Sequence, residues 1–283
     1  MKIITDESTI IPEEFLNYVD VIPLKLTYGK RDYTGKGHDE ILRGIEEGKY
    51  FKTGLPSPGE ILEFYRKYKN EKIISVHVSS KISGVVNSAL NAAEKAKKEG
   101  IDVHVLDSKS AGPGCGLGII KGIKYYEETK KENIKEIMKV IEETAKNSYA
   151  IMAVPESHRL IKVRPIEGIK RFFKNPDYFI KFLRSRGGFP IVYLSQEKLK
   201  LLEFTNEKNK AIEYMINFLR EKVKKESISI LYFYSTEKMF IYDLEEKIES
   251  EFSVKNKWIA RVTPTILSAI GRFAFGFCFS KTL

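Results

Sequence analysis

The first half of the chain alternates short apolar runs with helical patterns, and this alternation limits the possible folds more than any other feature. The runs Lys2–Thr5, Lys72–Val78 and Asp102–Asp107 are apolar and rich in β-branched residues, as buried strands are. Helical patterns follow over Val85–Lys98 and Gly116–Glu128. Strands that alternate with helices in this way form a parallel sheet with helices on both faces. We therefore predict an α/β fold with a doubly wound parallel sheet in this half.

Local signals predict further elements in the first half. Pro12 is expected to open a short helix within Ile11–Tyr18, and Val19–Tyr28 is expected to be extended. A helical pattern over His38–Gly48 ends at its glycine. Ser57 is the expected N-cap of the next helix, whose first turn contains Pro58.

The pattern changes after about residue 147, where strands become more frequent. Two strands around a short polar turn predict an antiparallel pair, and a helix is predicted over Asn209–Lys225. The predicted strands are Tyr149–Val154, Phe189–Ser195, Leu199–Thr205, Ser227–Ser235 and Trp258–Ile266. We therefore expect a two-domain α/β fold, with a parallel-sheet domain over 1–150 and a mixed-sheet α/β domain over 151–283. A chain of 283 residues is long for a single core, which favours this division.

Cysteine content and apolar patterning indicate the compartment. Cys115 and Cys278 are the only cysteines, which excludes a disulfide framework and suits a reducing environment. The N-terminal residues place acids directly after a short apolar stretch, unlike a signal peptide. No apolar run is long enough for a transmembrane segment. We therefore expect a cytoplasmic protein.

The net charge of +10 raises the question of a polyanionic partner. Lysine and glutamate are interleaved in most of the charged stretches, which is typical of solvated helix faces. Lys170–Arg186 is the exception, because basic residues alternate there with aromatics and Asp177 is the only acid. We expect this stretch to face a protein partner or a membrane, with no nucleic acid bound. A core-facing stripe and a nucleic-acid groove are the alternatives.

Small polar residues cluster where the predicted strands end. The carboxyl ends of neighbouring parallel strands share one edge of a sheet, and ligands of such sheets bind there. A further loop carries two hydroxyls just before a helix. The residues concerned are Thr5, Asp6, Ser8 and Thr9; Ser79, Ser80, Lys81 and Ser83; Asp107, Ser108 and Ser110; and Thr53 and Ser57.

Ser83 and Gly84 stand where a strand-to-helix seam exposes unpaired N–H groups and the positive end of the helix dipole. Such a seam can hold a carboxylate or phosphate, or Ser83 can simply cap its own helix. No recognised catalytic or nucleotide-binding motif is present, and the histidines lack metal-ligand spacing. An enzyme acting on a small anionic substrate, with Asp6 as base and Ser83 as nucleophile or substrate-binding residue, remains the alternative function.

Five segments in sequence order resemble the DegV family of bacterial fatty-acid-binding proteins. They are ITDEST, VIPLKLTYG, KTGLPSPGE, VHVSSKISGVVNSA and VHVLDSKSAGPGCG, and they cover most of the first 120 residues. The resemblance implies a two-domain α/β fold that binds a long-chain fatty acid without catalysis, metal or other cofactor. By motif, Thr53 and Ser83 match the family's ligands for the carboxylate. We include Gly84 and Ser80, from the same segment as Ser83, in the expected ligand set.

The second half departs from the family pattern in two places. The family's G-G-R segment has Arg164 as its nearest counterpart here. In the family's C-terminal H-x-G-P-G motif, Ala269 replaces the histidine and Arg272 the proline. The partner implied by the resemblance is a fatty-acid kinase subunit that phosphorylates the bound carboxylate. These departures fall on the outer surface expected to meet that partner.

Overall fold

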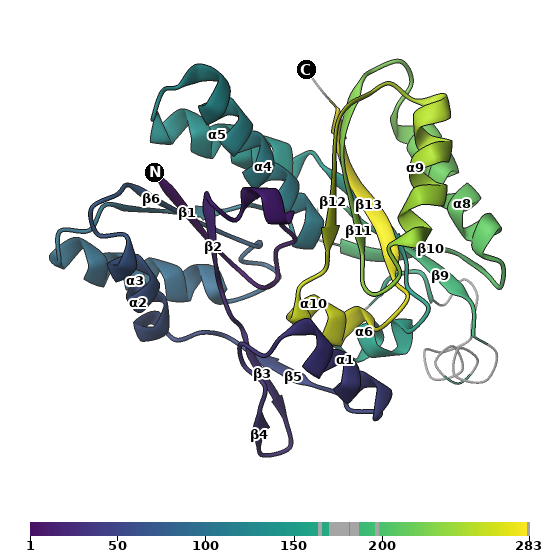
Figure 1. The fold of residues 1–283 in the computed structure, drawn as a ribbon, viewed down its shortest axis with the longest axis horizontal. Helices are drawn as coiled ribbons and strands as arrows, with labels where there is room; N and C mark the ends of the chain where they lie inside the picture. The colour runs from purple at the N-terminus through teal and green to yellow at the C-terminus, as the bar shows by residue number, and fades with distance from the viewer. Residues whose placement is uncertain (164–165, 170–180, 182–186, 196–197, 282–283) are drawn as a thin grey trace.

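The computed structural model describes residues 1–163, 166–169, 181, 187–195 and 198–281 (Figure 1). Arg164 and all of Lys170–Arg186 except Lys181 lie outside these residues, so the prediction made for that basic stretch stays a prediction. The described chain forms two large sheets flanked by helices, with a third, smaller sheet beside them.

The first sheet is wholly parallel, as predicted, with strand order β2-β1-β6-β7. Alternate residues of its strands pack against two helices on each face (Figure 1). Its strands are β1 (Lys2–Asp6), β2 (Val19–Ile22), β6 (Ile73–His77) and β7 (Val103–Asp107). The helices are α2 (Pro58–Lys67) and α3 (Val85–Lys98) on one face, and α4 (Gly112–Thr129) and α5 (Ile134–Lys146) on the other.

Local capping chemistry fixes the start of α2. The Ser57 side chain accepts a hydrogen bond from the Glu60 N–H at 3.3 Å, and the Glu60 carboxylate accepts one from the Ser57 N–H at 2.6 Å. This reciprocal capping box confirms Ser57 as the N-cap. In contrast, the short helix expected after Pro12 is a single 3-10 turn over Glu13–Phe15.

A small antiparallel sheet in the first half was not predicted. The segment expected to be extended over Val19–Tyr28 is divided at Pro23, which has no N–H to donate to a strand ladder. The chain then leaves the parallel sheet and joins the third sheet, whose order is β4-β3-β5. Its elements are β3 (Lys25–Tyr28), β4 (Arg31–Asp32) and β5 (Lys52–Gly54), with α1 (His38–Glu46) between β4 and β5.

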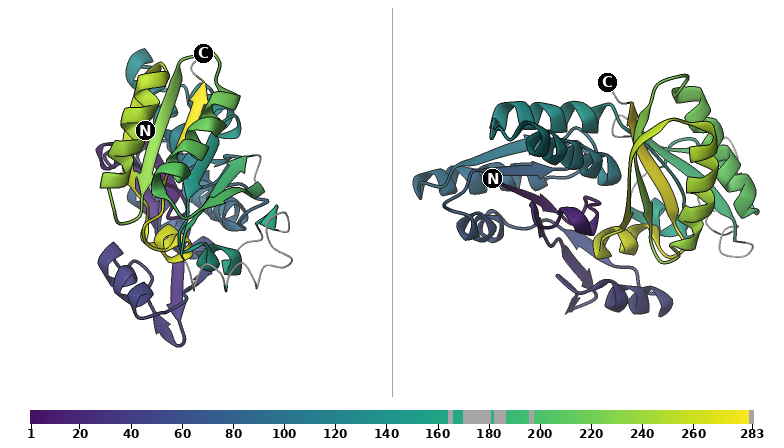
Figure 2. Two further views of the ribbon diagram at one scale, coloured as in Figure 1. Left: turned by 90° about the vertical axis from the view of Figure 1, so that its right-hand side faces the viewer. Right: turned by 45° about the horizontal axis from the view of Figure 1, so that its top comes forward.

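The second large sheet is mixed, as predicted, with order β10-β9-β8-β13-β11-β12. The neighbours are antiparallel apart from β11 and β12, and β9 and β10 form the predicted antiparallel pair. Two helices cover its outer face (Figure 2). The elements are β8 (Tyr149–Ala153), β9 (Phe189–Ser195), β10 (Lys198–Thr205), β11 (Ile228–Tyr234), β12 (Val254–Arg261), β13 (Phe275–Lys281), α8 (Lys208–Lys222) and α9 (Met239–Glu251).

One predicted strand was wrong at its C-terminal end. The strand expected over Trp258–Ile266 stops at Arg261, and Thr263 then caps α10 (Pro264–Ile270) by accepting a hydrogen bond from the Ile266 N–H. Thr263 and Pro264 together form a typical helix start, which overrides the β-branched composition. β13, α9 and α6 (Ser157–Val163) were not predicted.

Helix α4 joins the two large sheets. Its apolar residues belong to one core cluster with residues from both sheets, among them Ile74 of β6 and Leu231 of β11. A side chain at Gly116 would bring a Cβ within 1.9 Å of the Ile10 carbonyl oxygen, so glycine is required for this close approach. The domain boundary near residue 150 stays a prediction.

Candidate functional site

The carboxyl ends of three neighbouring strands lie at one edge of the parallel sheet, as expected. In register, Asp6 ends β1, His77 ends β6 and Asp107 ends β7. The loops that follow are bonded to one another: the Ser79 N–H donates to the Ser110 carbonyl at 2.7 Å, and the Ser80 N–H to Asp107 Oδ2 at 3.2 Å. The structure therefore brings the predicted polar strand ends together.

Asp107 holds its negative charge at this edge. Burial favours its neutral form, but hydrogen bonds from Lys109 and Ser80 prevail and lower its pKa. The Lys109 ammonium lies 2.8 Å from Asp107 Oδ2 and offsets the charge. An anion bound near these loops would therefore meet a carboxylate whose negative charge is balanced by the Lys109 ammonium.

Several of the clustered hydroxyls already bind one another or the backbone. Thr5 donates to Thr9 at 2.9 Å, Ser79 accepts from the Lys81 N–H at 3.2 Å, and Ser57 caps α2. These bonds stabilise the loops, and Thr5, Thr9 and Ser79 are buried, where polar atoms need partners. They are consequently poor candidates for ligand contacts.

Ser83 has hydrogen-bonding capacity to spare. The N-cap of α3 is Gly84, which has no side chain with which to cap the helix. The half-buried Ser83 hydroxyl accepts a long bond of 3.4 Å from the Val85 N–H, which leaves its own proton available to donate. The capping role considered for Ser83 is thus reduced to one weak contact.

Thr53 comes from β5 of the small sheet, and its segment reaches the start of α3. A Cβ on Gly84 would lie 2.8 Å from Leu55 Cδ1, so the segment that carries Thr53 touches the N-cap of α3. The Thr53 side chain is exposed, and within the described part of the chain no group hydrogen-bonds to its hydroxyl. Ser80 is likewise exposed, beside Ser83 in the same loop. What these four residues bind stays a prediction.

Asp6 lies at one end of a buried network of hydrogen-bonded side chains that was not predicted from the sequence. Its Oδ2 lies 2.8 Å from His77 Nδ1, and His77 Nε2 lies 2.7 Å from the Ser75 hydroxyl. The Tyr65 hydroxyl donates to Ser75 at 2.8 Å. These four residues are all fully buried. The Asp6 Oδ1 atom accepts from the N–H and hydroxyl of Ser8.

This buried network argues against the alternative function, an enzyme with Asp6 as its base. Ser75, His77 and Asp6 have the order of a hydrolytic triad, but no part of them is exposed. Both oxygens of Asp6 have partners, so Asp6 is placed as a structural group and not as a base facing a substrate. Burial raises the pKa of the Cys115 thiol to about 12, which disfavours a cysteine nucleophile.

The second half docks onto the loop that follows Asp6. Glu7 Oε2 accepts hydrogen bonds from the Thr265 hydroxyl at 2.8 Å and the Leu24 N–H at 3.0 Å. The Thr263 hydroxyl also donates to the Glu7 carbonyl. Burial raises the pKa of Glu7 despite these bonds. α10 is thereby held over the carboxyl edge of the parallel sheet.

The altered C-terminal motif has its own contacts. Arg272 Nη2 lies 3.0 Å from Glu156 Oε1, and the partly buried Ala269 packs against the main core. Phe273 follows with a φ of 60°, a conformation that favours glycine, and its side chain is exposed. This segment therefore carries an arginine paired with Glu156 and an exposed aromatic ring.

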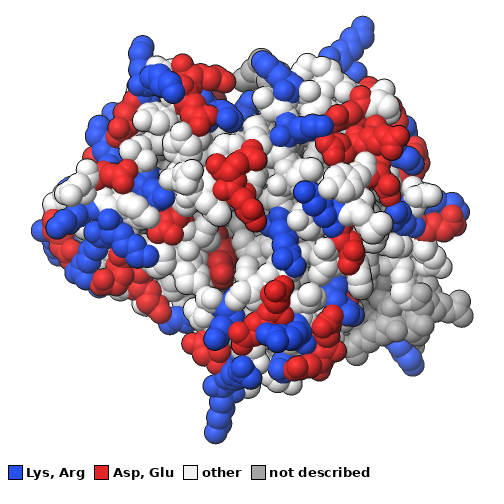
Figure 3. All heavy atoms as spheres, viewed as in Figure 1, with Lys and Arg blue, Asp and Glu red and all other residues white. Residues whose placement is uncertain are grey.

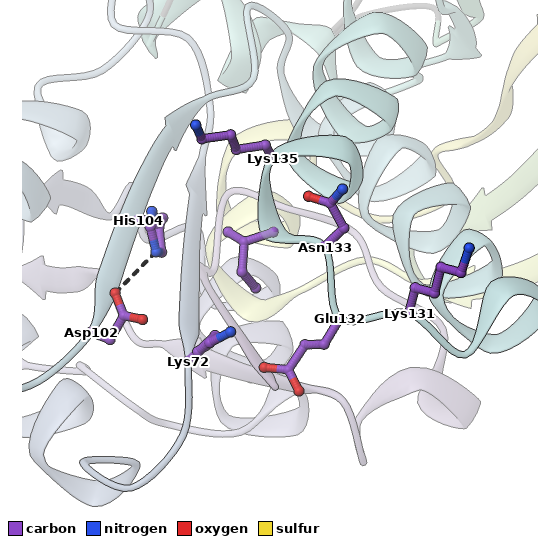
Figure 4. A pocket seen from close by; sticks show the side chains of 8 residues that line it. Lys72, Asp102, His104, Lys131, Glu132, Asn133 and Lys135 are labelled. Atoms are coloured by element: carbon purple, nitrogen blue, oxygen red, sulfur yellow. Dashed lines mark ion pairs between the residues drawn. The ribbon is translucent and has the colours of Figure 1, made fainter.

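A groove of about 640 Å³ lies at the opposite, amino end of the parallel sheet (Figure 4). His104 there pairs with Asp102 at 3.0 Å, and Lys131 points away from both. Its lining residues are Lys72, Asp102, His104, Lys131, Glu132, Asn133, Ile134 and Lys135. Acidic and basic groups largely offset one another in this groove, which makes it a weaker candidate for an anion than the carboxyl edge.

Basic and acidic side chains are interleaved on the face shown in Figure 3, as the sequence indicated. Within the described residues, no three His, Cys, Asp or Glu side chains gather as a metal site requires. No described helix is long and apolar enough to cross a membrane.

Comparison with protein families gives a match along almost the whole chain. A model described as an uncharacterised protein of the DegV family matches residues 1–282. The DegV domain-containing protein SACOL1460 of Staphylococcus aureus is 28% identical over 284 residues, which are 97% of this chain and 96% of the relative.

Solved structures share the fold. A DegV lipid-binding protein from Thermotoga maritima superimposes with a TM-score of 0.83 at 22% identity, covering 99% of this chain and 98% of the other. A fatty-acid-binding DegV family protein from Thermus thermophilus gives 0.82 at 21%, covering 99% of both chains. The fatty acid kinase B3 protein of Streptococcus pneumoniae, loaded with linoleic acid, gives 0.78 at 17%, also covering 99% of both.

Proposed function

This chain belongs to the DegV family, and from that premise we propose that it binds one long-chain fatty acid without catalysing a reaction. Thr53 and Ser83 hold the carboxylate, with the Gly84 amide and Ser80 beside them. Two of the structural neighbours are described as fatty-acid binding or loaded with linoleic acid, which supports this ligand class.

The observation that carries the proposal is the contact between the Thr53 segment and the start of α3. It brings the segment that carries Thr53 to the helix N-terminus that follows Ser83, where the dipole and the first N–H groups favour an anion. Hydroxyls and amides offset the cost of burying a carboxylate, which is several kcal/mol without hydrogen bonds. They do so without a fixed positive charge, which leaves the head accessible to later chemistry.

The acyl tail supplies most of the affinity in this proposal. Each buried CH2 group contributes about 0.8 kcal/mol, so a long chain is held firmly without a covalent bond. We place the tail in the apolar interior, with 151–283 as a second domain that covers it. The interface at Glu7 supports this placement, because it holds α10 against the carboxyl edge of the first sheet.

We extend the proposal to a cytoplasmic protein that presents its fatty acid to a fatty-acid kinase subunit. The likeness to the kinase B3 protein supports such a partner. Arg272 forms an ion pair with Glu156, and the exposed Phe273 follows it. The surface that meets a partner would therefore differ from that of relatives that carry the H-x-G-P-G motif.

Binding of oleic acid and of its methyl ester to lipid-free protein tests the proposal. The acid should bind about 10- to 150-fold more tightly, because hydrogen bonds to a charged group are worth about 1.5–3 kcal/mol. Competition titration gives both dissociation constants. Failure of both ligands to bind would contradict the function, whereas equal binding would contradict only the carboxylate site.

A further inference from the structure

Leu55 is a large apolar side chain in an unusual position. It is 44% exposed, it lies two residues after Thr53, and it contacts the N-cap of α3 at Gly84. Single exposed leucines are common on protein surfaces. Leu55 differs because its Cδ1 lies 2.8 Å from the place that a Cβ on Gly84 would take. The absence of a side chain at Gly84 lets Leu55 lie directly on the helix start.

The contact has a physical consequence for an anion at this helix start. Water competes for the Ser83 hydroxyl and for the first N–H groups of α3, and it screens the helix dipole. An apolar side chain over these groups excludes water and lowers the local dielectric constant, which strengthens hydrogen bonds to a bound carboxylate. Pro56, the next residue, is buried and anchors the segment behind Leu55.

We propose that Leu55 covers the carboxylate end of the bound fatty acid and is a positioning residue that slows its release. The inference rests on the proposed function, since it requires a fatty acid at Thr53 and Ser83. Leu55 acts through the Ser83 hydroxyl and the first N–H groups of α3 by keeping water from them. Gly84 is required for this arrangement, because a methyl group at position 84 would displace the Leu55 side chain.

The test measures the release of oleic acid from full-length protein to acceptor vesicles of phosphatidylcholine. Leu55→Ala should raise the dissociation rate constant about tenfold, because it removes most of the apolar side chain that covers the helix start. Leu90→Ala is the matched control, because Leu90 lies on α3 with a similar exposure of 47%. It should leave the rate unchanged.

Gly84→Ala gives a second, independent readout. It should accelerate release in the wild-type background, and add little in the Leu55→Ala background, where the displaced side chain is already absent. This non-additivity would not arise if Leu55 contributed only to stability. Melting temperatures of the lipid-free variants show whether each one folds.

Three outcomes overturn the inference. They are equal release from wild type and Leu55→Ala, equal acceleration by Leu55→Ala and Leu90→Ala, and additive effects of Leu55→Ala and Gly84→Ala. In all three the wild type still binds oleic acid, so the proposed function survives. A wild-type protein that binds no oleic acid overturns both the function and the role of Leu55.

Discussion

Replacing Thr53 and Ser83 together by alanine is expected to weaken the binding of oleic acid about 10- to 150-fold while the protein stays folded. The loss corresponds to about 1.5–3 kcal/mol for hydrogen bonds to a charged carboxylate. If both hydroxyls hold the same head, the double variant should lose less than the sum of the two single variants. Titration of each lipid-free variant with oleic acid gives the affinities.

The structure separates this role from helix capping. Loss of a good N-cap costs about 1 kcal/mol of stability, but Gly84 is the N-cap of α3 and Ser83 makes one long bond. Ser83→Ala should therefore change the free energy of unfolding by less than 1 kcal/mol. Ser88→Ala, one turn further along α3, is the control and should leave affinity unchanged. A Ser83→Ala variant that loses stability but keeps its affinity for oleic acid would show the site assignment to be wrong.

His77→Ala is expected to cause the largest loss of stability, about 3–5 kcal/mol. His77 bonds to Asp6 on one side and Ser75 on the other, and all three side chains are fully buried. Its removal takes the His77 partner from Asp6 Oδ2 in a site that water does not reach, while Oδ1 keeps its bonds from Ser8. Urea unfolding, followed by circular dichroism, measures the change.

His104→Ala is the matched control on the neighbouring strand. His104 also pairs with an aspartate, at 3.0 Å, but both side chains are well exposed. Exposed pairs contribute about 0–1 kcal/mol, so this variant should unfold close to wild type. Equal losses of unfolding free energy from His77→Ala and His104→Ala would contradict the structural role assigned to the buried network.

Elements defined by local chemistry could be predicted from the sequence. The limits of α3 match the predicted Val85–Lys98, and Ser57 caps α2 as expected. In both cases the deciding residues lie within a few positions of the boundary. The parallel and antiparallel character of the two large sheets followed from the spacing of strands and helices.

Elements that depend on pairing with distant parts of the chain could not be predicted from the sequence. β3 pairs with β4 and β5 in a separate sheet, and only the break at Pro23 hints at its departure. β13 lies between β8 and β11, and this central position depends on pairing with strands far away in sequence. The start of α10 could have been found, because Thr263 followed by proline is a common helix start.

The same distinction applies to the candidate site. The polar strand ends were predicted from the sequence, because parallel neighbours share their carboxyl edge. The bond between Asp6 and His77 was not, because it requires β1 to lie beside β6 in one particular register. The contact between Leu55 and Gly84 joins the small sheet to α3 and has no sequence signal of its own.

Solvent extraction of the purified, denatured protein, followed by mass spectrometry of the extract, tests the central claim most directly. An apolar site for a long acyl chain is costly to leave empty, so the ligand should stay bound through purification. We expect the extract to contain a stoichiometric amount of long-chain fatty acid. A well-folded preparation that yields no acyl chain would contradict the claim that this protein is a fatty-acid carrier.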